Sequence, residues 1–188
     1  MRSFCLTLFL IFIAALCFAQ NVSVKSTEKY LELINKHVEN SSLKQKDLGS
    51  MSKLGGTVTG YYLNKKLVLI TTSYGGQFGY IDHSFYMEND SLVYVNEKKI
   101  ILKEPETEKE YEAYEKYVIF NTDKNGKTDL TKWPLTVNIS NAYYFGNGQI
   151  VKYRLKSFDK TVKPFENEIE RAAKDLIYRY HTHCEELR

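Results

Sequence analysis

The chain has 188 residues, of which 43% are hydrophobic and 26% charged, and its formal net charge is +3. This length fits one domain, and the composition excludes a disordered or a fibrous protein. So small a positive charge also argues against a dedicated nucleic-acid-binding protein. Fifteen tyrosines and ten phenylalanines favour β-strands.

The first nineteen residues have the three parts of a secretory signal peptide. Arg2 supplies a positive start, residues 4–18 form an apolar run, and Cys17 and Ala19 put small residues before a cleavage site. The run is shorter than the roughly 20 residues that span a bilayer. We therefore expect cleavage near Ala19 and an exported domain, residues 20–188, that is periplasmic or extracellular. A transmembrane anchor and a lipid attached to Cys17 are the alternatives.

The exported chain retains Cys184 as its single cysteine, so it cannot form an internal disulfide. A core of ordinary size can stabilise a chain of this length without one. The chain also contains no second apolar stretch long enough to span a membrane.

The first part of the exported chain is predicted to be helical and the next part β-rich. Ser26 and Thr27 can cap a helix from Glu28 to Asn40, with Leu31, Ile34 and Val38 on one face. Residues 41–56 are polar and predict a loop, with one more turn of helix as an alternative for part of it. Four strands follow, and their short connections make neighbours antiparallel. They are Thr57–Leu63, Lys66–Ser73, Gly79–Met87 and Leu92–Leu102.

An acidic insertion is expected at about residues 103–134. Thr107 and Glu110 form a capping-box pattern, which predicts a short exposed helix. Its glutamates are either a docking surface for a basic partner or a solvated helix face.

Two more strands and a helix complete the expected fold. The strands are residues 135–145 and 149–157, and Pro164 opens the helix. The helix has an apolar stripe that includes Ile169, Leu176 and Tyr180. The fold class is therefore α+β: an antiparallel β-meander of about six strands packed by an N-terminal and a C-terminal helix.

An internal repeat is the strongest signal in the sequence. Three segments share one pattern: two aromatic residues and an apolar one, then a turn with Asn, then an aliphatic pair. This pattern predicts three β-hairpins of similar structure. The segments are residues 61–68, 85–93 and 143–151.

These residues resemble the variant MORN-type repeat, in which a Tyr-Tyr-x-x-Asn-Gly-x-Leu hairpin recurs. Tyr62-Leu63-Asn64-Lys65-Lys66-Leu67, then Tyr74-Gly75-Gly76 and Phe85-Tyr86, carry the resemblance, and residues 141–155 match more loosely. Lys65 and Asp90 replace the family's turn glycine. The resemblance implies an antiparallel meander that serves as an interaction scaffold, and it implies no catalytic residues.

Strand parity predicts a stripe of tyrosines on one sheet face. Tyr61, Phe85 and Tyr143 share the register of core residues, which directs Tyr62, Tyr86 and Tyr144 to the opposite face. An exposed aromatic stripe stacks on sugars or anchors a protein. The alternative is that a helix covers this face and the rings are packed.

The best metal candidate is a loop with oxygen-bearing side chains at the spacing of a calcium site. These residues are Asn121, Asp123, Asn125 and Asp129. Lys132 stands where a calcium loop has a bidentate glutamate. A second candidate is the cluster of His181, His183 and Cys184, which offers soft ligands for zinc or copper.

We expect an exported, non-enzymatic interaction protein of the cell envelope, because the sequence carries no catalytic motif. Its partner is expected to be an envelope protein or a polysaccharide, met through the sheet of repeated hairpins. The alternative is a domain that binds a small ligand or a metal in a pocket between the sheet and the helices. We expect no cofactor, and calcium at the loop of residues 121–129 is the alternative.

Overall fold

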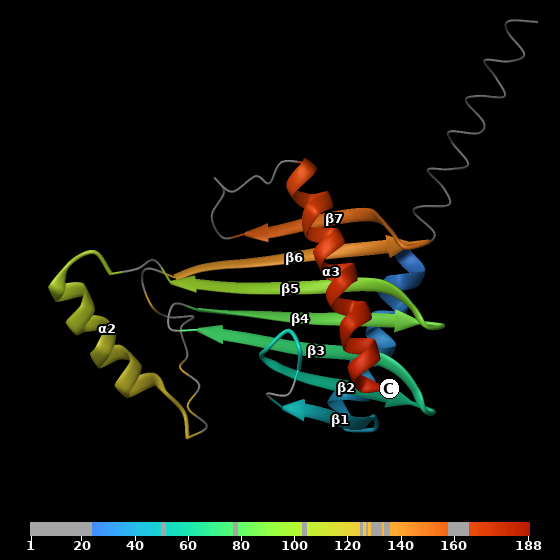
Figure 1. Ribbon diagram of the computed structural model, residues 1–188, viewed down its shortest axis with the longest axis horizontal. Coiled ribbons are helices and arrows are strands. Elements are labelled where there is room, and N and C mark those ends of the chain that lie inside the picture. The colour runs from blue at the N-terminus through green and yellow to red at the C-terminus, as the bar shows by residue number, and fades with distance from the viewer. Residues whose placement is uncertain are drawn as a thin grey trace, which may run out of the picture.

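The computed structural model describes residues 24–49, 52–76, 79–102, 105–124, 126, 128, 133, 136–157 and 166–188. Its centre is a seven-stranded sheet in which each strand is hydrogen-bonded and antiparallel to its neighbours in sequence (Figure 1). The strands are β1 (Lys44–Gly49), β2 (Thr57–Leu63), β3 (Lys66–Gly76), β4 (Gly79–Glu88), β5 (Ser91–Leu102), β6 (Thr136–Gly146) and β7 (Gln149–Ser157). The predicted α+β meander is confirmed, with one more strand than expected.

The additional strand is β1, which lies where the sequence predicted a loop. Its first four residues are exposed, and only Leu48 packs against the core. β1 pairs with β2 alone and forms one edge of the sheet. An edge strand with a polar sequence lacks the alternation by which strands are recognised.

The three repeated segments form three similar hairpins, β2–β3, β4–β5 and β6–β7. Both residues of each two-residue turn have positive φ, as in type I′ turns, whose twist suits a hairpin. The turns are Asn64-Lys65, Asn89-Asp90 and Asn147-Gly148. Beside each turn the strand pairing shifts by one residue, which marks a β-bulge. The shifts fall at Tyr61/Tyr62, Tyr86/Met87 and Tyr144/Phe145.

Two helices cover opposite faces of the sheet (Figure 1). α3 (Glu166–Leu187) crosses one face, and Leu176 and Tyr180 from its predicted stripe lie in that core. Residues 24–39 form a helix on the other face, where Ile34 is fully buried. Ser26 and Thr27 therefore lie inside this helix and do not cap it, which corrects the predicted start.

α2 (Glu108–Asn121) connects β5 to β6 and lies beyond the end of the sheet (Figure 1). The predicted capping box is present: Glu110 N donates to Thr107 Oγ1 at 3.3 Å, and Thr107 N donates to Glu110 Oε2 at 3.1 Å. None of the residues of α2 is buried, and Ile119 and Phe120 are 72% and 83% exposed. Within the described ranges, no helix combines the length and the apolar character needed to cross a membrane.

Candidate functional site

The predicted aromatic face is packed and not exposed. Tyr86 and Tyr144 are only 9% and 4% exposed because the N-terminal helix lies over them. The Tyr86 hydroxyl donates to Asn35 Oδ1 at 2.8 Å, and the Tyr144 hydroxyl donates to Glu28 Oε1 at 3.3 Å. The helix therefore supplies the hydrogen-bond partners of both hydroxyls. These two tyrosines fit the alternative interpretation, in which a helix covers this face of the sheet.

Tyr62 lies on the opposite face from Tyr86 and Tyr144, which corrects the predicted stripe. Its hydroxyl donates to the carbonyl of Leu187 at the end of α3, at 2.9 Å. Counted back from the turns, Tyr61 holds the position that Tyr86 and Tyr144 hold in their hairpins. Tyr61 also packs in the same cluster as Tyr86. The row that the repeat creates is therefore Tyr61, Tyr86 and Tyr144.

The predicted calcium loop is only partly described. The Asn121 side chain donates to the carbonyl of Tyr117 at 2.8 Å, and Asp123 lies beyond the end of α2. Asn125 and Asp129 lie outside the described residues. Among the residues that are described, no group of three or more His, Cys, Asp and Glu side chains is arranged to hold a metal ion. Calcium binding stays a prediction.

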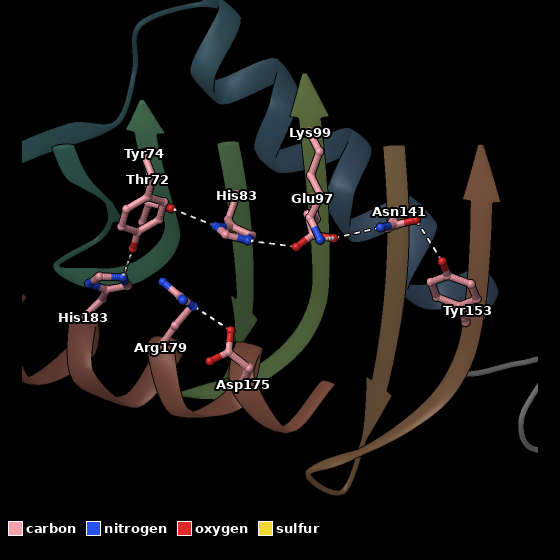
Figure 2. A network of polar contacts seen from close by, with 10 residues as sticks. All are labelled: Thr72, Tyr74, His83, Glu97, Lys99, Asn141, Tyr153, Asp175, Arg179 and His183. Atoms are coloured by element: carbon pink, nitrogen blue, oxygen red, sulfur yellow. Dashed lines mark hydrogen bonds and ion pairs between the residues drawn. The ribbon is translucent and has the colours of Figure 1, made fainter. Parts of the chain in front are cut away.

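A row of buried polar side chains crosses the sheet beside α3 (Figure 2). Thr72, His83, Glu97 and Asn141 are directly paired across β3, β4, β5 and β6, and each is 6% exposed or less. His83 Nδ1 lies 3.2 Å from Thr72 Oγ1, and His83 Nε2 lies 3.2 Å from Glu97 Oε2. Asn141 Nδ2 donates to Glu97 Oε1 at 2.8 Å, and the Tyr153 hydroxyl donates to Asn141 Oδ1 at 2.8 Å. These bonds join five strands.

Glu97 is the charged centre of this row. Burial opposes its ionisation, but the hydrogen bonds from His83 and Asn141 and the charge of Lys99 outweigh burial, so the pKa of Glu97 falls to about 2. Lys99 Nζ lies 3.0 Å from Glu97 Oε1. Both carboxylate oxygens are engaged by protein groups, which suits a structural role for the row better than action on a ligand.

The C-terminal part of α3 is fixed to the sheet through His183. This side chain is fully buried, its Nε2 lies 2.9 Å from the Tyr74 hydroxyl, and its Nδ1 lies 3.1 Å from Glu186 Oε2. Burial lowers the pKa of His183 in spite of the nearby carboxylate. Both ring nitrogens are engaged, so His183 presents no free ligand atom toward His181 and Cys184. The predicted cluster of soft ligands therefore does not form a site in this conformation.

A hollow of about 360 Å³ lies between the end of α3 and the β2–β3 hairpin. Leu67, Met87, Cys184 and Leu187 give it an apolar floor. Burial raises the pKa of the Cys184 thiol. Gly60 allows this approach of helix to strand, because a Cβ at that position would lie 2.9 Å from a methyl group of Leu187.

Charged side chains surround this floor. Lys65 and Lys66 stand at the hairpin turn, Arg188 follows α3, and Asp90 comes from the β4–β5 turn. All four are exposed. The hollow therefore combines an apolar interior with a rim on which three cations face one carboxylate.

A second hollow of about 450 Å³ adjoins the first. It lies between the N-terminal helix, the turns of β4–β5 and β6–β7, and the middle of α3. Ser26, Thr27 and His181 are among its polar residues, and it shares Asp90 and Tyr180 with the first hollow. Both hollows are thus built between the sheet and its helices.

Comparison of the chain with protein-family models, with curated proteins and with solved structures gave no match.

Proposed function

We propose that this chain is an exported, non-enzymatic binding domain of the cell envelope that holds a small ligand in the first hollow. The observation that carries the proposal is the apolar floor of Leu67, Met87, Cys184 and Leu187 beneath a polar rim. Binding sites for small molecules have this construction, and their volumes start at roughly 300 Å³. The signal-peptide pattern of residues 1–19 supports the envelope location.

The histidine–carboxylate pairs of the sheet and of α3 fit a structural role better than catalysis. In the described part of the chain, histidine meets a carboxylate in two places, at His83–Glu97 and at His183–Glu186. Both histidines are buried, and each has a second protein partner on its other ring nitrogen. A general base needs a ring nitrogen that reaches a substrate.

A second candidate function is binding of an envelope protein or a polysaccharide through α2. Ile119 and Phe120 are 72% and 83% exposed on a helix that lies beyond the sheet. Neighbouring exposed apolar side chains of this size are typical of interaction surfaces. The aromatic row no longer serves this candidate, because its rings pack under the N-terminal helix.

The test uses the protein expressed from its full-length sequence and purified from the envelope fraction of its host. Native mass spectrometry of the wild type and of Cys184→Ala should detect a bound small molecule. The variant Cys184→Trp places a large ring in the hollow and should therefore carry no small molecule. If the wild type carries no small molecule, and an envelope extract does not slow the reaction of Cys184 with a thiol reagent, the ligand proposal is wrong.

The same preparation tests the second candidate. Affinity capture with the wild type and with the double variant Ile119→Ser/Phe120→Ser compares the proteins and polysaccharides that are retained. A partner that is retained by the wild type and by Cys184→Trp, and is lost from the α2 variant, would favour an interaction protein.

A further inference from the structure

The rim of the first hollow has an excess of positive charge that the rest of the described structure does not neutralise. Lys65, Lys66 and Arg188 contribute three cations, and Asp90 contributes one anion. Within the described ranges, none of the three cations forms an ion pair with an aspartate or a glutamate. A negatively charged group at this rim would therefore gain attraction without displacing an existing partner.

One of these cations occupies a backbone position that disfavours it. Lys65 has a φ of 68° in its turn, a conformation that glycine adopts readily and lysine does not. The equivalent positions of the other two hairpins hold Asp90 and Gly148, with φ of 62° and 74°. Of the three hairpins, only β2–β3 has a lysine at this position. The repeat therefore brings a lysine to the rim from one turn and Asp90 from the next.

The floor lies next to this charge and is apolar. Leu67 and Cys184 are half-buried and present apolar surface to the hollow, whereas Met87 and Leu187, each 2% exposed, close it from beneath as part of the core. A ligand with one apolar chain and one charged end satisfies both parts at once. A wholly polar anion would leave the floor unpaired, and a cation would meet like charges at the rim.

This step rests on the proposed function, and we propose that the ligand of the first hollow is a single-chain amphiphile with an anionic head group. The head group lies against Lys65, Lys66 and Arg188, and the chain covers the half-buried side chains of Leu67 and Cys184. The volume of about 360 Å³ is near the lower end of small-molecule sites, which suits one chain and not two.

The test compares three probes that share one chain and differ in the head group: decanoate, decanol and decyltrimethylammonium. Acetate tests the head group alone. The protein, expressed from its full-length sequence and exported, is titrated calorimetrically with each probe below its critical micelle concentration. Decanoate should bind most tightly. Added salt should weaken that binding, because the ion contacts are exposed. Bound decanoate should also slow the reaction of Cys184 with a thiol reagent.

Two double variants separate the rim from the general charge of the protein. Lys65→Asn/Lys66→Gln removes two rim cations, and asparagine suits the positive φ at position 65. It should weaken decanoate binding about tenfold and leave decanol binding unchanged. The control Lys109→Gln/Lys116→Gln removes two exposed lysines of α2 and should change neither.

Other outcomes overturn the ligand class or the site. Equal affinity for decanoate and decanol in the wild type, or no effect of the rim variant, would overturn the anionic head group while leaving a ligand-binding hollow. Binding of acetate as tight as that of decanoate would overturn the apolar chain. If none of the four probes binds, the amphiphile is wrong. The small molecule that co-purifies with wild type but not with Cys184→Trp then decides whether the proposed function stands.

Discussion

The hydroxyl of Tyr180 donates a hydrogen bond to the backbone carbonyl of Asp90 at 3.0 Å, and these two residues line both hollows. Tyr180 belongs to α3, and Asp90 belongs to the turn between β4 and β5. The bond therefore joins the helix to the tip of a hairpin at the boundary between the two hollows. Its loss would loosen the packing of α3 where the proposed ligand binds.

Tyr180→Phe should lower the free energy of unfolding by about 1 kcal/mol, because it removes one hydrogen bond and keeps the buried ring. Urea denaturation measures this change. The control is Tyr178→Phe, since Tyr178 is 61% exposed on the same helix and should be neutral. Equal stability of the wild type and both variants would mean that the Tyr180–Asp90 bond contributes nothing.

Glu97 should give the protein an acid-sensitive stability. Its pKa is about 2 in the folded chain, against an ordinary value of 4.5. The unfolded chain binds a proton first as the pH falls from 4.5 towards 2, so stability is lost in that window, on the order of 3 kcal/mol. Urea denaturation between pH 7 and pH 2 measures the loss.

Glu97→Gln tests the origin of that sensitivity. The amide cannot be ionised, so this part of the acid dependence should vanish, and stability at pH 7 should fall by about 2 kcal/mol as the charge-assisted bonds weaken. Glu115→Gln on the exposed helix α2 is the matched control and should behave as the wild type. An unchanged acid profile in Glu97→Gln would contradict the role of the row.

His183 predicts a second pH dependence at a higher pH. Burial holds its pKa below the ordinary value of 6.5, so the unfolded chain takes up a proton before the folded chain does. Stability should therefore decline as the pH falls below about 6.5. Comparing unfolding at pH 7.5 and pH 5.5 for the wild type, His183→Asn and the control His37→Asn measures this. The decline should diminish only in His183→Asn.

The hairpins of this fold could be predicted from the sequence because their signals are local. Turn residues such as Asn64 and Asn147 and the flanking strand patterns set β2–β3 and β6–β7 without reference to the rest of the chain. β1 could not be predicted in this way, because an exposed edge strand does not need alternating apolar and polar residues. The predicted face of Tyr62 is wrong because the strand pairing shifts by one residue after Tyr61. This shift lies at a fixed distance from the turn, so Tyr61 and not Tyr62 corresponds to Tyr86 and Tyr144. Aligning the aromatic pairs of the three segments does not take that shift into account.

The hollow depends on a contact between distant parts of the chain, and for this reason sequence patterns did not reveal it. The end of α3 docks on β1 and β2, where Lys46 of β1 and Tyr62 of β2 both donate to the carbonyl of Leu187. Two signals were present. Gly60 interrupts a strand pattern, and Cys184 and Leu187 extend the apolar stripe of α3 beyond Tyr180. Neither says which strand meets the helix.

The packing of the aromatic row gives a last prediction. Tyr144→Ala should destabilise the protein by about 3 kcal/mol, because it removes a buried ring from contact with Tyr94, whose centroid lies 4.9 Å away. Tyr62→Ala should cost about 1 kcal/mol, since that ring is half-buried and loses chiefly its bond to Leu187. Urea denaturation ranks the two variants. Equal and small losses would restore an exposed aromatic face, whereas a large loss for Tyr144 alone fits rings that serve the fold beneath the N-terminal helix.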